Sequence, residues 1–177
     1  MENPVGTASF SSKRIVSIFC LLSVLSVLGC TARERFTSLE TPLPSSTILY
    51  LIRPVGTSMA VWNYDLDIYK YRRHFREEKE PRKVASVSLS NGTFWTGNFS
   101  EGFYKISLRS DPSAEKIVLL KKDGIVFLEF LIFNKDEISR PEYFLKEVDQ
   151  ATALEALLEN EKLFRETAKF YPEGERN

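Results

Sequence analysis

The sequence predicts a mainly β fold, a β-sandwich or small barrel, with an α-helix at its C-terminal end and an export signal before it. Turn signals recur between Pro54 and Gly124, separated by short apolar or alternating segments, at the spacing of about eight to twelve residues that is typical of sandwiches and barrels. The last part of the chain has helical periodicity instead. The N-terminus is basic and then apolar, as in secretory signals.

Composition limits the possible functions. The chain has 177 residues, which favours one domain, and 43% of them are hydrophobic, which is enough for a packed core. Its 24 cationic and 24 anionic residues balance, so we expect no attraction to nucleic acid. Two cysteines and one histidine are too few for a disulfide framework or a zinc site, so we expect no cofactor apart from a covalent lipid.

The first 29 residues have the pattern of a signal peptide. Lys13 and Arg14 form a basic segment, and the 14 residues from Ile15 to Leu28 carry no charge. This run is shorter than the roughly 20 residues that a helix needs to span a bilayer. Residues 1–29 are therefore excluded from the prediction of the fold.

Val27-Leu28-Gly29-Cys30 resembles the lipobox of bacterial lipoproteins. The resemblance implies that the chain is cut before Cys30 and that this cysteine carries a lipid anchor. Two alternatives are an uncleaved signal anchor and a secreted protein with a free thiol. Thr31 stands where an aspartate commonly retains lipoproteins in the inner membrane, which favours the outer membrane.

Residues 30–46 read as the lipidated cysteine followed by a flexible tether. Pro42, Pro44 and a Ser/Thr cluster occur here without apolar periodicity. Fully extended, this segment would reach about 50 Å and lift the domain away from the membrane.

Residues 47–148 contain the strands. Ile48–Ile52 is a continuous apolar strand that ends before Pro54. The next segment alternates: one face is apolar and the other is polar, which predicts a strand buried on one side. Asn91-Gly92 and Lys122-Asp123-Gly124 each predict a hairpin turn, of type I′ in the second case. The apolar face of the alternating segment consists of Trp62, Tyr64, Leu66 and Ile68. Further strands are expected at 84–90, 93–99, 102–110, 115–121, 125–133 and 143–148.

Residues 149–170 predict a helix. Asp149 is suited to cap a helix that runs from about Gln150 to Lys169. The helix either packs on the domain or projects from it to bind a partner. Its apolar stripe consists of Ala151, Leu154, Leu157, Leu158 and Phe164. Residues 171–177 are expected to form a disordered tail.

The stretch Tyr50–Pro54, "YLIRP", shortly after a lipobox resembles the first strand of an uncharacterised family of bacterial lipoproteins with a Y-x-x-R-P-type β domain. "GTFWTGNFSEGFYKISL" and "LLKKDGIVFLEFLIF" are similar to its later segments, so the resemblance covers about residues 46–158. It implies an immunoglobulin-like or prealbumin-like β-sandwich and assigns no catalytic residue. Glu101 departs from the proline usual before Gly102, and residues 70–83 look like an insertion.

A possible binding face lies on the polar side of the alternating strand, at Asp65, Asp67, Tyr69 and Tyr71. Residues two apart on a strand are about 7 Å apart, close to the roughly 6.5–9.5 Å that separates the carboxylates of inverting glycosidases. The tyrosines could stack on a sugar or a peptide. The alternative is an ordinary solvated strand face.

Residues 70–83 contain seven cationic residues and three glutamates. Arg72, Arg73 and Arg76 form a possible basic patch for anionic lipid headgroups or lipopolysaccharide phosphates. The alternative is a solvated loop in which the glutamates neutralise the arginines. His74 reads as a surface histidine, and Arg53 as a structural residue that bonds loop carbonyls.

These observations predict a membrane-anchored lipoprotein of the bacterial cell envelope, which acts as a non-enzymatic binding or assembly module. Its partners would be the membrane, through the lipid on Cys30, and an envelope protein or glycan, with no nucleic acid. The alternative is an envelope glycan-processing hydrolase that uses Asp65 and Asp67. Periplasmic and surface-exposed placement both remain open.

Overall fold

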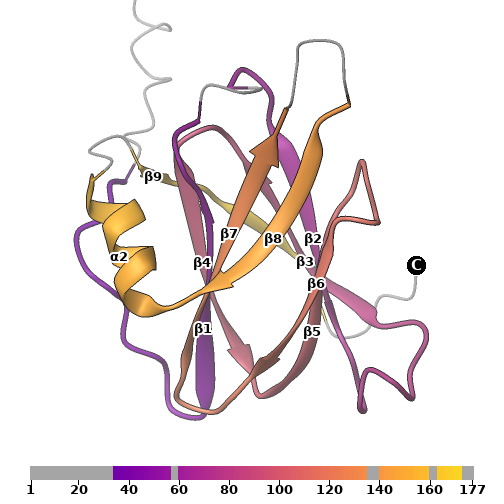
Figure 1. Cartoon of the computed structure of the whole chain (residues 1–177). Coiled ribbons are helices and arrows are strands. Elements are labelled where there is room, and N and C mark those ends of the chain that lie inside the picture. The colour runs from indigo at the N-terminus through magenta and orange to yellow at the C-terminus, as the bar shows by residue number, and fades with distance from the viewer. Residues whose placement is uncertain (1–33, 57–59, 135–139, 160–162, 173–177) are drawn as a thin grey trace, which may run out of the picture. The chain divides into compact units, whose positions relative to one another are not determined.

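The structure, a computed structural model, describes residues 34–56, 60–134, 140–159 and 163–172. These residues form two β-sheets and one short helix (Figure 1), which confirms the mainly β prediction and fits a β-sandwich. The signal peptide and Cys30 lie outside the described residues. The elements are β1 (Ser46–Arg53), β2 (Tyr64–Lys70), β3 (Arg82–Leu89), β4 (Thr93–Ser100), β5 (Gly102–Leu108), β6 (Glu115–Leu120), β7 (Ile125–Phe133), β8 (Glu142–Val148), α2 (Gln150–Glu159), β9 (Phe164–Arg165) and β10 (Ala168–Phe170).

Sheet A has the strand order β8-β7-β1-β4-β9, and sheet B has the order β10-β3-β2-β5-β6. β1 lies at the centre of sheet A, antiparallel to β4 and parallel to β7. Leu49 and Leu51 of β1 belong to the core that includes side chains of both sheets. Ile48, Tyr50 and Ile52 belong to a second core, together with residues of α2. Both faces of β1 are therefore buried, which explains why its sequence is continuously apolar.

β2 confirms most of the predicted alternation. Tyr64, Leu66 and Ile68 are buried in the core of the sandwich. Trp62 was expected on the same face, and this prediction is wrong, because Trp62 precedes β2 and 60% of it is exposed. The alternation ends where the strand ends.

The two turns predicted to close hairpins instead join the two sheets. The Asn91-Gly92 turn leads from β3 in sheet B to β4 in sheet A, and the turn at Asp123 leads from β6 in sheet B to β7 in sheet A. Each turn contains one residue in the left-handed region, Gly92 with a φ angle of 65° and Asp123 with one of 57°. A type I′ turn needs two such residues in succession, so the type I′ turn expected at Asp123-Gly124 is not formed. A residue with a positive φ angle allows the chain to reverse direction sharply, but it does not determine whether the strands before and after the turn pair with each other.

The C-terminal helix is shorter than predicted. Asp149 caps it through its carboxylate, which accepts the Thr152 N–H at 2.8 Å, but α2 ends at Glu159 rather than near Lys169. Ala153 and Leu157 are buried against sheet A, so the helix packs on the domain instead of projecting. The following residues form β9 and β10, which extend the open edges of the two sheets at β4 and β3. Strand pairing at these edges satisfies backbone groups that no local pattern identifies.

The predicted tail and tether are also shorter than expected. The Tyr171 N–H donates to the Val84 carbonyl at 2.9 Å, so the chain is still attached to sheet B at this point; residues 173–177 lie outside the described part. Of the predicted tether, the residues from Glu34 onward lie on the domain, where Phe36 and Leu39 pack against the second core. The prediction of a flexible tether up to residue 46 is therefore wrong for residues 34–46.

The sandwich has two ends, which we name after the ends of β1 (Figure 1). At the Arg53 end, β1 finishes opposite the start of β4, β7 finishes and β8 begins. At the Ser46 end, β1 and β7 begin and β4 finishes. Glu34 and Arg35 lie at the Arg53 end, because Arg35 forms a β-bridge with Phe164, which is paired with Thr93.

Candidate functional site

Asp65 and Asp67 share the outer face of sheet B, and one arginine joins them. Arg109, just after β5, lies 2.7 Å from Asp65 Oδ2 through Nη1 and 2.7 Å from Asp67 Oδ1 through Nη2. Its Nε–H also donates to Asp67 Oδ2 at 3.2 Å. The arrangement is a bidentate ion pair on Asp67 with a second carboxylate on the remaining nitrogen.

Asp67 is the centre of this cluster and is almost completely buried. Lys83 Nζ lies 2.8 Å from Asp67 Oδ1, and the Ser86 hydroxyl donates to the same oxygen at 2.8 Å. Burial raises the pKa of Asp67, but the hydrogen bonds from Arg109, Lys83 and Ser86 outweigh this effect and lower the pKa to about 2. A general acid for glycoside hydrolysis needs a raised pKa, so this geometry favours a structural ion-pair cluster over the hydrolase hypothesis.

The two tyrosines of the predicted binding face have different surroundings. Tyr69 is half-buried beside Asp67, and Lys105 Nζ lies 5.2 Å from the centre of its ring. Burial and the negative charge of Asp67 raise the pKa of the Tyr69 hydroxyl. Tyr71 follows β2, is buried, and contacts the ring of Phe75. The structure therefore keeps Asp65, Asp67 and Tyr69 together and separates Tyr71 from them.

Sequence reasoning missed Arg109, which organises this face. The available signal was that an aspartate between the buried residues Leu66 and Ile68 needs a cationic partner. The sequence offers 24 cationic residues and does not say which of them lies on the neighbouring strands. Only the pairing of β2 with β3 and β5 brings Lys83 and Arg109 to Asp67.

A basic hollow of about 660 Å³ lies at the Ser46 end, where β2 finishes and β5 begins. It includes two of the three arginines of the predicted patch, Arg72 and Arg73, while Arg76 lies outside its lining and has its guanidinium 5.7 Å from the Phe75 ring centre. Neither Arg72 nor Arg73 makes an ion pair with any described residue. The lining consists of Lys70, Tyr71, Arg72, Arg73, His74, Arg82, Val84, Glu101, Gly102 and Phe103.

The loop that carries these arginines has its own supports. The Glu78 carboxylate accepts the backbone N–H groups of Arg72 at 2.5 Å and of Arg73 at 3.3 Å. The ring of His74 stacks on Phe75 at 4.6 Å and meets Phe103 of β5 edge-on at 4.7 Å. Glu78 therefore orders the backbone of the loop, contrary to the expectation that the glutamates neutralise the arginine side chains here. The two guanidinium groups remain free to meet an anion.

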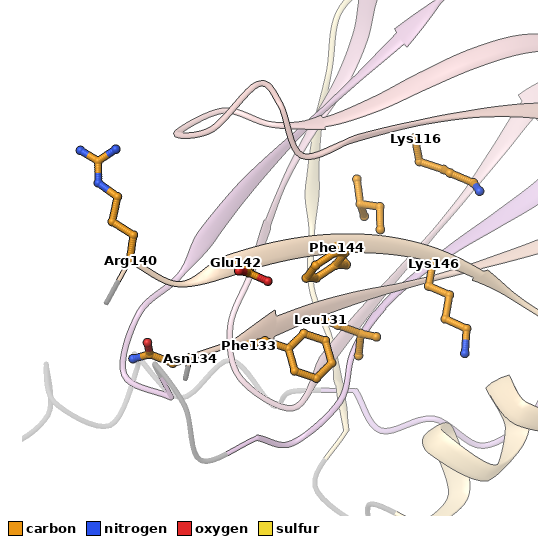
Figure 2. A pocket seen from close by; sticks show the side chains of 9 residues that line it. Lys116, Leu131, Phe133, Asn134, Arg140, Glu142, Phe144 and Lys146 are labelled. Atoms are coloured by element: carbon orange, nitrogen blue, oxygen red, sulfur yellow. The ribbon is translucent and has the colours of Figure 1, made fainter. Parts of the chain in front are cut away.

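A groove of about 890 Å³ follows the edge strand β8 (Figure 2). Phe133 and Phe144 are exposed here, and their rings meet edge-on at 5.6 Å. The lining consists of Lys116, Leu131, Phe133, Asn134, Arg140, Glu142, Phe144, Leu145 and Lys146. It combines apolar side chains with three cations and one carboxylate.

Arg53 has the structural role that the sequence predicts. It is 2% exposed, and its Nη1 donates to the carbonyls of Trp62 at 2.6 Å and Leu89 at 3.0 Å. Its guanidinium also lies 4.9 Å from the centre of the Tyr64 ring. Burial lowers the pKa of Arg53. Arg53 thus fastens the end of β1 to the chain just before β2 and to the end of β3.

No family model matches this chain, and no curated protein matches it. The described residues include no cluster of His, Cys, Asp and Glu suited to a metal ion. Among the same residues, no helix is long and apolar enough to cross a membrane.

Proposed function

We propose that this protein is a lipid-anchored protein of the bacterial cell envelope, in the outer membrane, whose β domain binds a partner without catalysis. The anchor part of the proposal is supported by Val27–Cys30 after a basic and apolar N-terminus. Two or more acyl chains hold a protein firmly, because each buried CH₂ contributes about 0.8 kcal/mol.

The observation that carries the binding part is the basic hollow at the Ser46 end. Arg72 and Arg73 line it, make no ion pair with any described residue, and are exposed. A guanidinium pairs with carboxylate or phosphate through two parallel hydrogen bonds. The partner is accordingly an envelope protein or glycan that offers an anionic group.

Within the β-sandwich class, we propose the prealbumin-like arrangement over the immunoglobulin-like one. In immunoglobulin constant domains the first two strands share a sheet. Here β1 belongs to sheet A and β2 to sheet B. The parallel pairing of β1 with β7 at the centre of sheet A adds support for a different strand order.

Labelling with radioactive palmitate in the native membrane tests the anchor. The wild-type chain is expected to incorporate palmitate, and Cys30→Ala to lose it, since the thiol is the attachment point. The labelled protein should fractionate with the outer membrane. Equal labelling of the two chains would contradict the anchor, and labelled protein in the inner membrane would contradict the placement.

Crosslinking of the lipidated protein in its membrane, followed by mass spectrometry, tests the hollow. The double variant Arg72→Ser/Arg73→Ser should lose the partner that wild type captures. Lys121→Ser/Lys122→Ser is the matched control, because it removes the same charge from exposed positions at the same end. An unchanged partner set in the arginine variant would contradict the proposed binding site.

A further inference from the structure

Four large apolar side chains are exposed at the Arg53 end, and we call them the apolar rim. Val55, Val61 and Trp62 are 47%, 89% and 60% exposed, and Phe133 is 55% exposed. They come from the connection between β1 and β2 and from the tip of β7. Exposed apolar side chains gathered at one site indicate an interaction surface.

The rim is held in place by the buried Arg53. Its bond to the Trp62 carbonyl fixes the chain just before β2. Val55 and Phe133 line one hollow of about 250 Å³ together with Arg53 itself. The rim is therefore attached to the core of the sandwich rather than carried on a free loop.

The start of the described chain lies at this same end. Arg165 holds Glu34 through its backbone N–H, which donates to the Glu34 carbonyl at 2.7 Å, and through its guanidinium, 3.5 Å from the Glu34 carboxylate. Arg165 also binds Glu40, at 2.7 Å. Three residues separate Cys30 from Glu34, so the two Cα atoms are at most roughly 14 Å apart.

We propose that the Arg53 end rests on the lipid bilayer and that the apolar rim enters its interfacial layer. This inference rests on the proposed lipid at Cys30, because the short connection to Glu34 then keeps this end of the domain at the membrane surface. Tryptophan is enriched at such interfaces, where its ring contacts acyl chains and its N–H stays hydrated.

The charges beside the rim fit a bilayer with anionic lipids. Figure 2 shows Phe133 and Phe144 with Lys116 and Lys146 along the groove and Arg140 just before β8. Glu142 is the one carboxylate in that lining. Cations close to a negatively charged membrane surface are attracted to it, while the phenylalanines meet its apolar layer.

The test uses the full lipidated protein in vesicles of phosphatidylethanolamine and phosphatidylglycerol whose acyl chains are brominated near the headgroups. The chain has two tryptophans, Trp62 in the rim and Trp95 in the core, so the difference in emission between wild type and Trp62→Phe is that of Trp62. We expect the brominated lipids to quench most of this difference and to leave the emission of Trp62→Phe unchanged.

A matched control places the fluorescent tryptophan at the Ser46 end instead of the Arg53 end. Leu43 is 60% exposed at the Ser46 end, so Leu43→Trp in the Trp62→Phe background should not be quenched. Quenching equal to that of Trp62, or no quenching of Trp62, would overturn the inference. The mass of the N-terminal peptide separates the two proposals: a chain without lipid overturns both, whereas a lipidated chain with unquenched Trp62 overturns only the contact of the rim.

Discussion

The Arg53 end and the Ser46 end of the sandwich are about 23 Å apart along β1, at roughly 3.3 Å per residue. The Arg53 end exposes Trp62 and Phe133 and receives the N-terminal segment, whereas the Ser46 end exposes Arg72 and Arg73. By charge alone, residues 70–83 were the candidate for contact with the membrane. The strand order places them at the end away from Glu34, so the same arginines are better suited to a partner beyond the membrane surface.

The largest expected effect concerns the arginine that holds the Arg53 end. Arg53→Met should lower the free energy of unfolding by about 3 kcal/mol, because the carbonyls of Trp62 and Leu89 lose their charged donor. Urea denaturation measures the change. Arg82→Met is the control at the Ser46 end, where Arg82 donates to the Pro172 carbonyl at the surface. Loss of this hydrogen bond should lower the free energy of unfolding by less than about 1 kcal/mol. Equal losses would mean that the Arg53 end is no more firmly held than the rest.

A smaller loss of stability is expected from a change at Asp67, which lies midway between the two ends of the sandwich. Asp67→Asn should lower the free energy of unfolding by about 2 kcal/mol, because Arg109 and Lys83 lose the charge that they share. Asp65→Asn is the control, with an expected loss below about 1 kcal/mol, since Asp65 pairs with Arg109 at the surface.

Asp67 should also make the stability of the folded protein depend on pH. The pKa of Asp67 is about 2 in the folded protein and about 3.9 in an unfolded chain, so the unfolded state binds the proton first as the pH falls. The stability that Asp67 contributes is therefore complete only above about pH 5, and most of it is lost as the pH falls from about 4 to 2. Denaturation midpoints measured across this range should fall more steeply in wild type than in Asp67→Asn. Parallel curves would show that the cluster does not depend on the Asp67 charge.

Structural features that depend on residues close together in the sequence were predicted correctly. Features that depend on contacts between distant segments of the chain were not. The central strand at Ile48–Ile52, the Asp149 cap and the role of Arg53 follow from local patterns, and the structure confirms them. The residues of a turn do not determine whether the two strands beside it pair with each other, so the prediction of a hairpin at Asn91-Gly92 is wrong. The ion pairs of Asp67, the short strands after α2 and the rim at Trp62 all depend on which strands lie side by side, information that no window of sequence contains.

The smallest loss of stability is expected for Arg165→Ala. This substitution tests most directly whether the N-terminal segment is attached at the Arg53 end. Arg165→Ala should cost about 1 kcal/mol, because Arg165 loses its pairs with Glu34 and Glu40 at the surface. Hydrogen exchange of residues 34–40 should become faster, while exchange of the strands stays the same. Lys122→Ala, which removes one exposed cation at the other end, should leave exchange of residues 34–40 unchanged.

Release of this segment also changes the reach of the anchor. The chain between Cys30 and Thr41 would then span up to about 34 Å, so the lipid would no longer hold the Arg53 end close to the bilayer. Quenching of Trp62 by brominated lipids should therefore decrease in Arg165→Ala. Faster exchange with undiminished quenching would show that the apolar rim holds the domain on the membrane by itself. Unchanged exchange would show that Phe36 and Leu39 fix the segment without Arg165, and that the two ends differ through apolar contacts alone.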